Sequence, residues 1–191
     1  MAISDNEIIE QILRGDKRRY SYLVDKYKDK AFGLALRLLR NREEAEEAAE
    51  DAFFRAYNAL ERFQGKSGFG TWLYRIVYNV CVTRLSGKKT DIKLSEYNEG
   101  REYEDNGFPF QPSIYETVEL NDMIGFVQKT MEGMPERYQL ILSLFYFQEL
   151  SYDEISETID IPVGTVKTHL FRARIMLQER INHELKTEKA S

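Results

Sequence analysis

The sequence predicts an all-α protein made of two helical domains joined by a flexible acidic linker. Through most of the 191 residues, apolar positions recur every three to four residues, as on one face of a helix. The chain has only 4 prolines and 11 glycines, which favours long helices. Periodicity is lost from about residue 90 to residue 112, where acidic, glycine, asparagine and proline residues dominate. We therefore expect a first domain at 1–89, the linker at 90–112 and a second domain at 113–191.

Capping signals mark the helices expected in the first domain. Ser4 is followed three residues later by Glu7, which is the spacing of a capping box. A longer apolar helix should end near Arg40, and Asn41 should begin the next one. The first turns of that helix are acidic, with Glu43, Glu44, Glu46, Glu47, Glu50 and Asp51. Such a run is usually a solvated helix face, and the alternative is a docking surface for a basic partner.

The charge reverses after a glycine-rich loop at 63–70, which lacks the glycine spacing of a phosphate-binding loop. We interpret this loop as a hinge-like connector to a helix that begins at Thr71. Basic and aromatic residues alternate along that helix, and this suits single-stranded nucleic acid because bases stack on rings while cations follow the backbone. Core packing is the favoured interpretation of Trp72 and Ile76. For Asn79, a polar residue in an apolar run, both interpretations stay open.

The stretch 150–174 has the pattern of a helix-turn-helix. Ser151 and Glu154 have capping-box spacing, and Pro162 suits the first turn of a second helix. Opposite the apolar stripe of the second helix lie Gly164, Thr165, Thr168, Phe171 and Arg172, with Lys167 and Arg174 on the flank. Small, hydroxyl and cationic side chains in these places suit contacts with base edges and phosphates. An ordinary αα-hairpin with a solvated basic face is the alternative.

Composition and missing motifs limit the other function classes. The net charge of −5 argues against a protein that simply coats nucleic acid, and the single cysteine, Cys81, excludes an internal disulfide. We find no Cys/His cluster with metal spacing and no paired nucleophile and base, so we expect no metal, no cofactor and no catalytic residue. Because no apolar run reaches the length of a membrane span and no signal peptide is visible, we expect a cytoplasmic protein without direct membrane insertion.

The order of these motifs resembles that of bacterial sigma factors of the extracytoplasmic-function (ECF) group, in the sigma-70 family. In the first half the resemblance rests on FFRAYNAL at 53–60, ERFQG at 61–65 and TWLYRI at 71–76. In the second half it rests on PERY at 135–138 and on 150–174. The resemblance implies a specificity subunit that binds core RNA polymerase and promoter DNA, both duplex and single-stranded. It also implies an anti-sigma factor as a partner, because family members are often held inactive by one.

The resemblance further implies roles for individual residues. The second domain would read the minus-thirty-five element as duplex, through Lys167, Thr168, Phe171 and Arg172, with Arg174 at a phosphate and Thr165 added from the helical wheel. The first domain would capture the non-template strand of the minus-ten element. Asn79 matches the position near the pocket for a flipped base, whose edge needs hydrogen bonds. Arg75 and Tyr78 are weaker candidates.

The sequence departs from the family pattern at two places. In the polymerase-docking helix the family usually shows Asp and then a Gln-Glu pair, whereas this chain has Glu47, Glu50 and Asp51, with Phe54 following on the expected docking face. The docking surface is therefore more acidic than usual. In the helix-turn-helix, Glu149 and Asp160 replace glycines common in the family, which we interpret as tolerated turn variation.

Two other function classes are weighed against a sigma factor. A free-standing helix-turn-helix regulator would dimerise on a palindrome, and then the basic aromatic helix and the acidic linker would have no role. A pure protein-interaction module would have no need of the outward-facing Lys167, Thr168 and Arg172.

Overall fold

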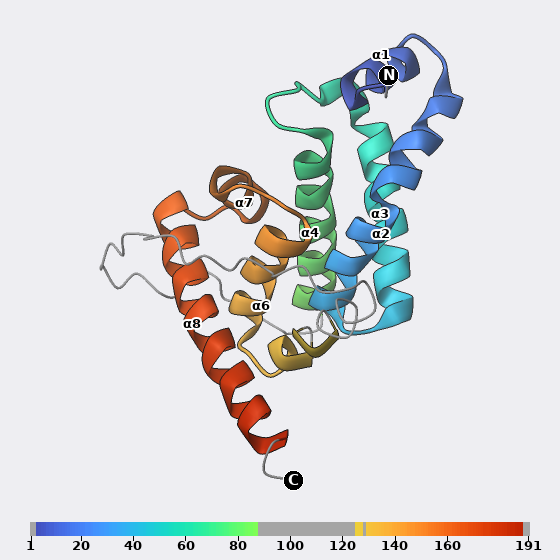
Figure 1. Ribbon diagram of the computed structural model, residues 1–191. Coiled ribbons are helices and arrows are strands. Elements are labelled where there is room, and N and C mark those ends of the chain that lie inside the picture. Colours follow the sequence, from blue (N-terminus) through green and yellow to red (C-terminus); the bar gives the residue numbers. More distant parts are fainter. Residues whose placement is uncertain (1–2, 88–124, 128, 189–191) are drawn as a thin grey trace.

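The computed structural model describes residues 3–87, 125–127 and 129–188, and the regular structure within these ranges is helical (Figure 1). The expected linker at 90–112 and the expected start of the second domain at 113 lie outside the described residues. The first domain contains α1 (Asp5–Leu13), the 3₁₀ turn η1 (Lys17–Arg19), α2 (Tyr20–Leu39), α3 (Arg42–Asn58), the 3₁₀ turn η2 (Leu60–Arg62) and α4 (Phe69–Gly87). The second contains α6 (Glu136–Leu142), the π-helical turn η3 (Ser143–Phe147), α7 (Tyr152–Ile159) and α8 (Val163–Glu188).

Local hydrogen bonds begin the helices where the sequence predicts. The Ser4 side chain accepts from the Glu7 backbone N–H while the Glu7 carboxylate accepts from the Ser4 N–H, which confirms the capping box. The Asn41 side chain accepts from the N–H of Glu44 at 3.1 Å and caps α3. Helix α4 starts at Phe69, two residues before the predicted Thr71. Local sequence therefore accounts for most of the helix starts.

The core of the first domain lies between α2, α3 and α4, which pack pairwise against one another. Leu23, Leu34, Leu73 and Val77 are fully buried there. The buried face of α3 consists of alanines and Phe53, and the alanines let the helix backbones lie close together. Helix α4 packs against both α2 and α3, and these contacts fix its orientation.

The core of the second domain lies where α8 crosses α6 and α7. The apolar stripe predicted for the recognition helix is buried at Val166, Leu170 and Ala173, and it meets Ile141 and Ile155 from the neighbouring helices. His169, next to the stripe, is also buried, whereas Lys167 on another side of α8 is exposed.

The two domains pack directly against each other, an arrangement that sequence periodicity does not reveal. Figure 1 shows α7 lying between α4 of the first domain and α8 of the second, and α7 contacts both. Thr71 Oγ1 donates a hydrogen bond to Glu154 Oε1 at 2.7 Å across this contact. On the other side of the interface, the Arg37 guanidinium lies 4.2 Å from the centroid of the Phe147 ring.

Candidate nucleic-acid interface

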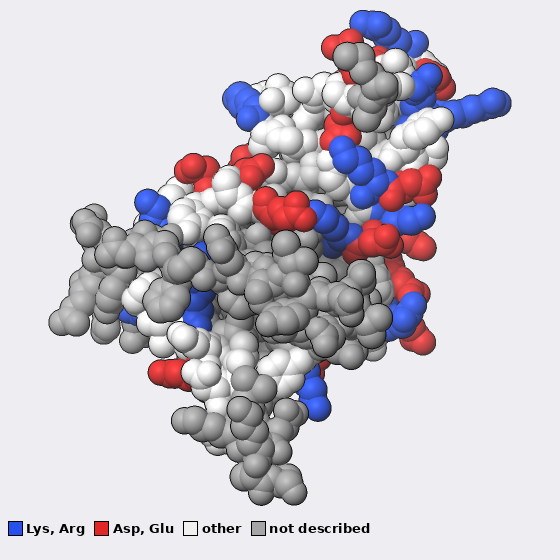
Figure 2. Space-filling model, in the orientation of Figure 1, with Lys and Arg blue, Asp and Glu red and all other residues white. Residues whose placement is uncertain are grey.

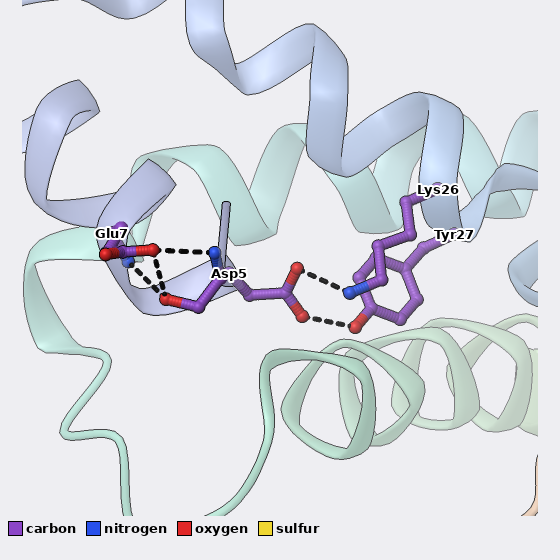
Figure 3. A network of polar contacts seen from close by, with 5 residues as sticks. Asp5, Glu7, Lys26 and Tyr27 are labelled. Carbon is purple, nitrogen blue, oxygen red and sulfur yellow. Dashed lines mark hydrogen bonds and ion pairs between the residues drawn. The ribbon is translucent and has the colours of Figure 1, made fainter. Parts of the chain in front are cut away.

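A polar network ties the N-terminal helix to the centre of the first domain (Figure 3). Asp5 lies in the first turn of α1 and accepts hydrogen bonds from Lys26 Nζ at 2.6 Å and from the Tyr27 hydroxyl at 2.5 Å. Burial raises the pKa of the Tyr27 phenol, and the hydrogen bond to the Asp5 carboxylate raises it further. Tyr27 therefore stays protonated and is held in one orientation on α2.

The Tyr27 ring in turn fixes the start of α4. A Cβ atom at Gly70 would lie 2.8 Å from Tyr27 Cε1, so only glycine allows the ring and the helix to approach this closely. Tyr27 also contacts Phe69, which packs against Phe63 and Trp72 in an aromatic cluster. The 63–70 loop, expected to act as a hinge, is thus anchored by the partly buried Phe63 at one end and the buried Phe69 at the other. Trp72 is partly buried against the core, as predicted.

The three candidate minus-ten residues on α4 have different environments. Arg75 and Asn79 lie one helical turn apart, and both are exposed. Tyr78 is only 9% exposed, and burial together with the charge of Asp160 raises its pKa to about 12. The structure therefore brings Arg75 and Asn79 together on an accessible strip and places Tyr78 under the second domain.

The cations of the first domain divide into two groups. Most of those in residues 3–87 pair with a carboxylate, such as Arg84 with Glu47 at 3.0 Å. The side chains of five others make no hydrogen bond, ion pair or ring contact within the described residues: Lys17, Arg18, Arg62, Lys66 and Arg75. They come from η1, η2, the 63–70 loop and α4, all next to α1 or to the start of α4. Blue side chains are visible at this upper end of the molecule in Figure 2. This end, which we call the basic end, is suited to contact phosphates.

The helix-turn-helix forms as predicted around α7 and α8. The Ser151 side chain accepts from the N–H of Glu154 in the second capping box. At the N-terminal end of α8, Lys167 is exposed, and Thr165 and Thr168 are half-buried. The Thr168 hydroxyl donates to the Gly164 carbonyl at 2.9 Å, one turn earlier in α8. Phe171 and Arg172 follow one turn later and are also half-buried.

Arg174 occupies a different environment from the other candidate minus-thirty-five residues. Its Nε donates to the Tyr146 hydroxyl at 3.0 Å, and its guanidinium lies 5.1 Å from the centroid of the Phe145 ring. These contacts hold Arg174 against η3 within its own domain. A guanidinium has further donors, so the arginine can be oriented by Tyr146 and still reach a phosphate.

The candidate polymerase-docking residues share one face of α3. Glu50, Asp51 and Phe54 follow Glu47 by three, four and seven residues, which places the four side chains along one stripe. Phe54 is 67% exposed, the largest exposed fraction among the large apolar side chains of the described residues. Asp51 accepts two hydrogen bonds from Arg55, whereas Glu50 is exposed and makes no contact with another described side chain. An exposed ring among carboxylates suits a partner with basic and apolar surface.

Sequence reasoning named Thr71 and Glu154 only as residues at helix starts and missed their contact with each other, and it missed Tyr146 altogether. Thr71 and Glu154 meet across the domain interface although they are 83 positions apart. Tyr146, which orients Arg174, has no local signal because it lies in a π-helical turn. Partial signals exist for the first two, since both lie in first turns of helices, where polar side chains are common.

The described residues contain no group of three His, Cys, Asp or Glu side chains placed to hold a metal ion. None of the helices searched in the same ranges combines the length and the apolar character that a bilayer span requires.

The fold and the two exposed helix faces define an all-α, two-domain protein with features suited to DNA. Two family models match the chain: Sigma-70 region 2 over residues 23–90 and Sigma-70 region 4 over residues 127–177. The first match covers α3, α4 and all of α2 from residue 23 onward, and the second covers α6, α7 and α8 up to residue 177.

Curated relatives match along nearly the whole chain. The ECF RNA polymerase sigma factor SigW of Bacillus subtilis is 36% identical over 180 residues, which is 91% of this chain and 94% of SigW. The RNA polymerase sigma-H factor of Pseudomonas aeruginosa is 35% identical over 178 residues, covering 89% and 90% of the two chains. The ECF sigma-E factor of Escherichia coli is 31% identical over 182 residues, covering 94% and 95%. The chain belongs to the ECF sigma factors, and it is a transcription initiation factor.

Solved structures show the same fold. CnrH, in complex with the cytosolic domain of CnrY, superposes with a TM-score of 0.65 at 17% identity, covering 95% of this chain and 99% of CnrH. RpoE of Bartonella quintana, in complex with the anti-sigma factor NepR, gives a TM-score of 0.62 at 19% identity, covering 85% of this chain and 96% of RpoE.

Proposed function

We propose that this ECF sigma factor holds a promoter at two places while it is docked on core RNA polymerase. The domains are proposed to be 1–89 for docking and minus-ten capture, 90–112 for the linker and 113–191 for the minus-thirty-five element. The observation that carries the proposal is that two exposed nucleic-acid faces lie on separate helices, α4 and α8, each within the range of its own sigma-70 region. The protein is proposed to act in the cytoplasm and to perform no chemistry of its own.

Strand capture is proposed for the exposed strip of α4. Asn79 offers an amide that can donate and accept, which suits the edge of an unstacked base, and Arg75 offers a charge for the backbone. Tyr78 is buried and lies near Asp160 of α7, so it would join them only after the second domain moves away from α4. Asn79→Ala should reduce open-complex formation, while binding to core polymerase stays unchanged.

Duplex reading is proposed for the N-terminal half of α8. Arg172→Ala should cost about 1–3 kcal/mol of promoter affinity and relax specificity at one position if Arg172 reads a base edge. Lys167→Ala, which removes a more exposed cation, should weaken binding uniformly across sequences and reduce the salt dependence. Equal weakening on all upstream sequences with Arg172→Ala would demote Arg172 to a phosphate contact.

Polymerase docking is proposed for the Glu47–Phe54 face of α3. Phe54→Ala and Glu50→Lys should each weaken binding to core polymerase, because the first removes apolar contact and the second reverses a charge. Tyr22→Ala, at an exposed ring on α2, is the matched control. Run-off transcription with core polymerase tests the whole proposal, and failure to direct any start site with a competent core enzyme would overturn it.

An anti-sigma factor is proposed as a further partner. The support is that CnrH was solved with the cytosolic domain of CnrY and the Bartonella RpoE with the anti-sigma factor NepR. A cognate anti-sigma factor should compete with core polymerase for this chain, and this can be measured by displacement of a labelled sigma factor.

A further inference from the structure

The π-helical turn η3 places an exposed phenol beside the recognition helix. Its wide hydrogen bond runs from the N–H of Gln148 to the carbonyl of Ser143 at 3.1 Å. Leu144 is fully buried and anchors the turn, whereas Tyr146 is 41% exposed. Because π-helical turns are rare and frequently occur at functional sites, the side chains that this one carries are candidates for a contact with another molecule.

The rings of η3 hold the side chain of Arg174 on α8. The rings of Phe145 and Tyr146 pack edge to face, with their centroids 4.9 Å apart. The Arg174 guanidinium lies 5.1 Å from the first centroid and 5.8 Å from the second. Burial lowers the pKa of Arg174, but its contacts with the hydroxyls of Tyr146 and Tyr152 outweigh burial, and the pKa is raised. These neutral groups orient the guanidinium without cancelling its charge.

The Tyr146 hydroxyl keeps a proton that it can donate. Its oxygen accepts a hydrogen bond from Arg174 Nε at 3.0 Å, and it donates none to the other residues that the structure describes. A phenol both donates and accepts, so its O–H is available to an acceptor outside the protein. Hydroxyl and guanidinium donors side by side are groups that proteins use to hold phosphate oxygens of DNA.

Arg174 lies on a flank of α8 rather than on its outermost face. At about 100° per residue, Lys167 and Arg174 lie within roughly 20° of each other around the helix, about two turns apart. Thr168 and Arg172 lie further round, opposite the buried stripe. A helix nearly fills the major groove, so each flank faces one sugar-phosphate strand. The flank with Lys167 and Arg174 therefore meets a strand when Thr168 and Arg172 reach base edges.

We propose that Tyr146 and Arg174 form one phosphate-binding site for duplex DNA, in which the Tyr146 hydroxyl both orients the guanidinium and donates to the same phosphate. The inference rests on the proposed reading of duplex DNA by α8. It extends the DNA contact to η3, which precedes the helix-turn-helix in the chain. Arg174 supplies the charge, and Tyr146 fixes the direction in which that charge points.

Duplexes with single uncharged phosphates test this site. The probe is a duplex that the full-length protein, bound to core polymerase, selects from a random library, and a methylphosphonate then replaces each upstream phosphate in turn. Tyr146→Phe keeps the ring and removes the hydroxyl. It should weaken binding to the unmodified duplex roughly tenfold, as expected for a hydrogen bond to a charged group. At one methylphosphonate position the difference between Tyr146→Phe and the parent should largely disappear, and Arg174→Gln should identify the same position.

A double-mutant cycle tests whether the two side chains act on one phosphate. Arg174→Gln should weaken binding and reduce the salt slope by about one. Tyr146→Phe should cost much less affinity in the Arg174→Gln background than in the parent, because residues that share a partner are not additive. Tyr22→Phe is the matched control, since it removes the hydroxyl of an exposed ring beside Arg19 on α2, and it should leave binding unchanged.

The outcomes separate this site from the proposed function. An equal loss with Tyr146→Phe on every methylphosphonate duplex would make Tyr146 a structural residue and overturn the site. Unchanged affinity in Tyr146→Phe, or full additivity in the cycle, would overturn it as well. These results would leave duplex reading by α8 intact, because the parent still binds its selected duplex. If the parent selects no duplex, the proposed duplex reading fails, and this inference fails with it.

Discussion

The two helices proposed to contact promoter DNA are supported in opposite ways. Helix α4 packs against α2, α3 and α7, and residues on several of its sides are buried. Helix α8 is held along one stripe by α6 and α7. A helix that is surrounded offers a narrow and rigid strip, as suits the positioning of one or two unstacked bases. A helix that is anchored on one side can enter a major groove.

The largest expected effect is a loss of stability when a buried leucine is removed from α4, compared with the same change in α8. Leu73→Ala in α4 should lower the free energy of unfolding by about 2–5 kcal/mol, since Leu73 is fully buried between helices. Leu170→Ala in α8 is the matched change in the second domain. Guanidinium unfolding followed by fluorescence of Trp72 should report mainly the first domain. If both variants shift this transition equally, the domains unfold as one unit and the contrast between the helices is lost.

The next effect concerns the polar network that positions α4. Tyr27→Phe removes the hydrogen bond to Asp5 and should lower the free energy of unfolding by about 1.5–3 kcal/mol, since the lost acceptor is charged. Lys26 still pairs with Asp5, which favours the lower end of this range. Tyr22→Phe, at an exposed ring, is the control and should change nothing.

A smaller effect, of opposite sign, is expected in the turn before α8. Asp160 has φ = 55°, in the left-handed region, which costs a non-glycine residue about 1–2 kcal/mol. Asp160→Gly should therefore raise the free energy of unfolding of the second domain by about 1 kcal/mol. Gly15→Ala, at φ = 113°, should lower the free energy of unfolding of the first domain. A loss of stability in Asp160→Gly would show that the Asp160 carboxylate stabilises the fold by more than its left-handed backbone destabilises it.

The smallest effect is a pH dependence of the stability of the second domain. His169 is 1% exposed beside Tyr138, and burial, followed by the charges of Arg137 and Arg172, lowers its pKa below the usual value. Because the folded protein favours neutral His169, this contribution to stability is present above about pH 6.5 and is lost as the pH falls. Unfolding midpoints at pH 8 and 5.5 measure this contribution of His169 to stability. His169→Gln should flatten this dependence, and an unchanged slope would assign it to other groups.

Part of the candidate site followed directly from the sequence. The helix-turn-helix, its capping box and the exposed Lys167 were predicted because they depend on residues within one or two turns of each other. Arg75, Tyr78 and Asn79 were candidates through the family resemblance alone, and the structure shows that Arg75 and Asn79 are exposed and that Tyr78 is buried. Helical spacing identifies an inward face but does not say which neighbour covers it.

The sequence by itself determined the helices, the capped starts of α1, α3 and α7, and the family, because capping bonds and apolar periodicity act over a few residues and the motifs are contiguous. Only the tertiary structure decided how the two domains meet. The hydrogen bonds from Thr71 to Glu154 and from Ser67 to Glu157 join positions 83 and 90 residues apart. A contact of that kind depends on two finished surfaces with complementary shape and charge, and no local pattern in either segment specifies it.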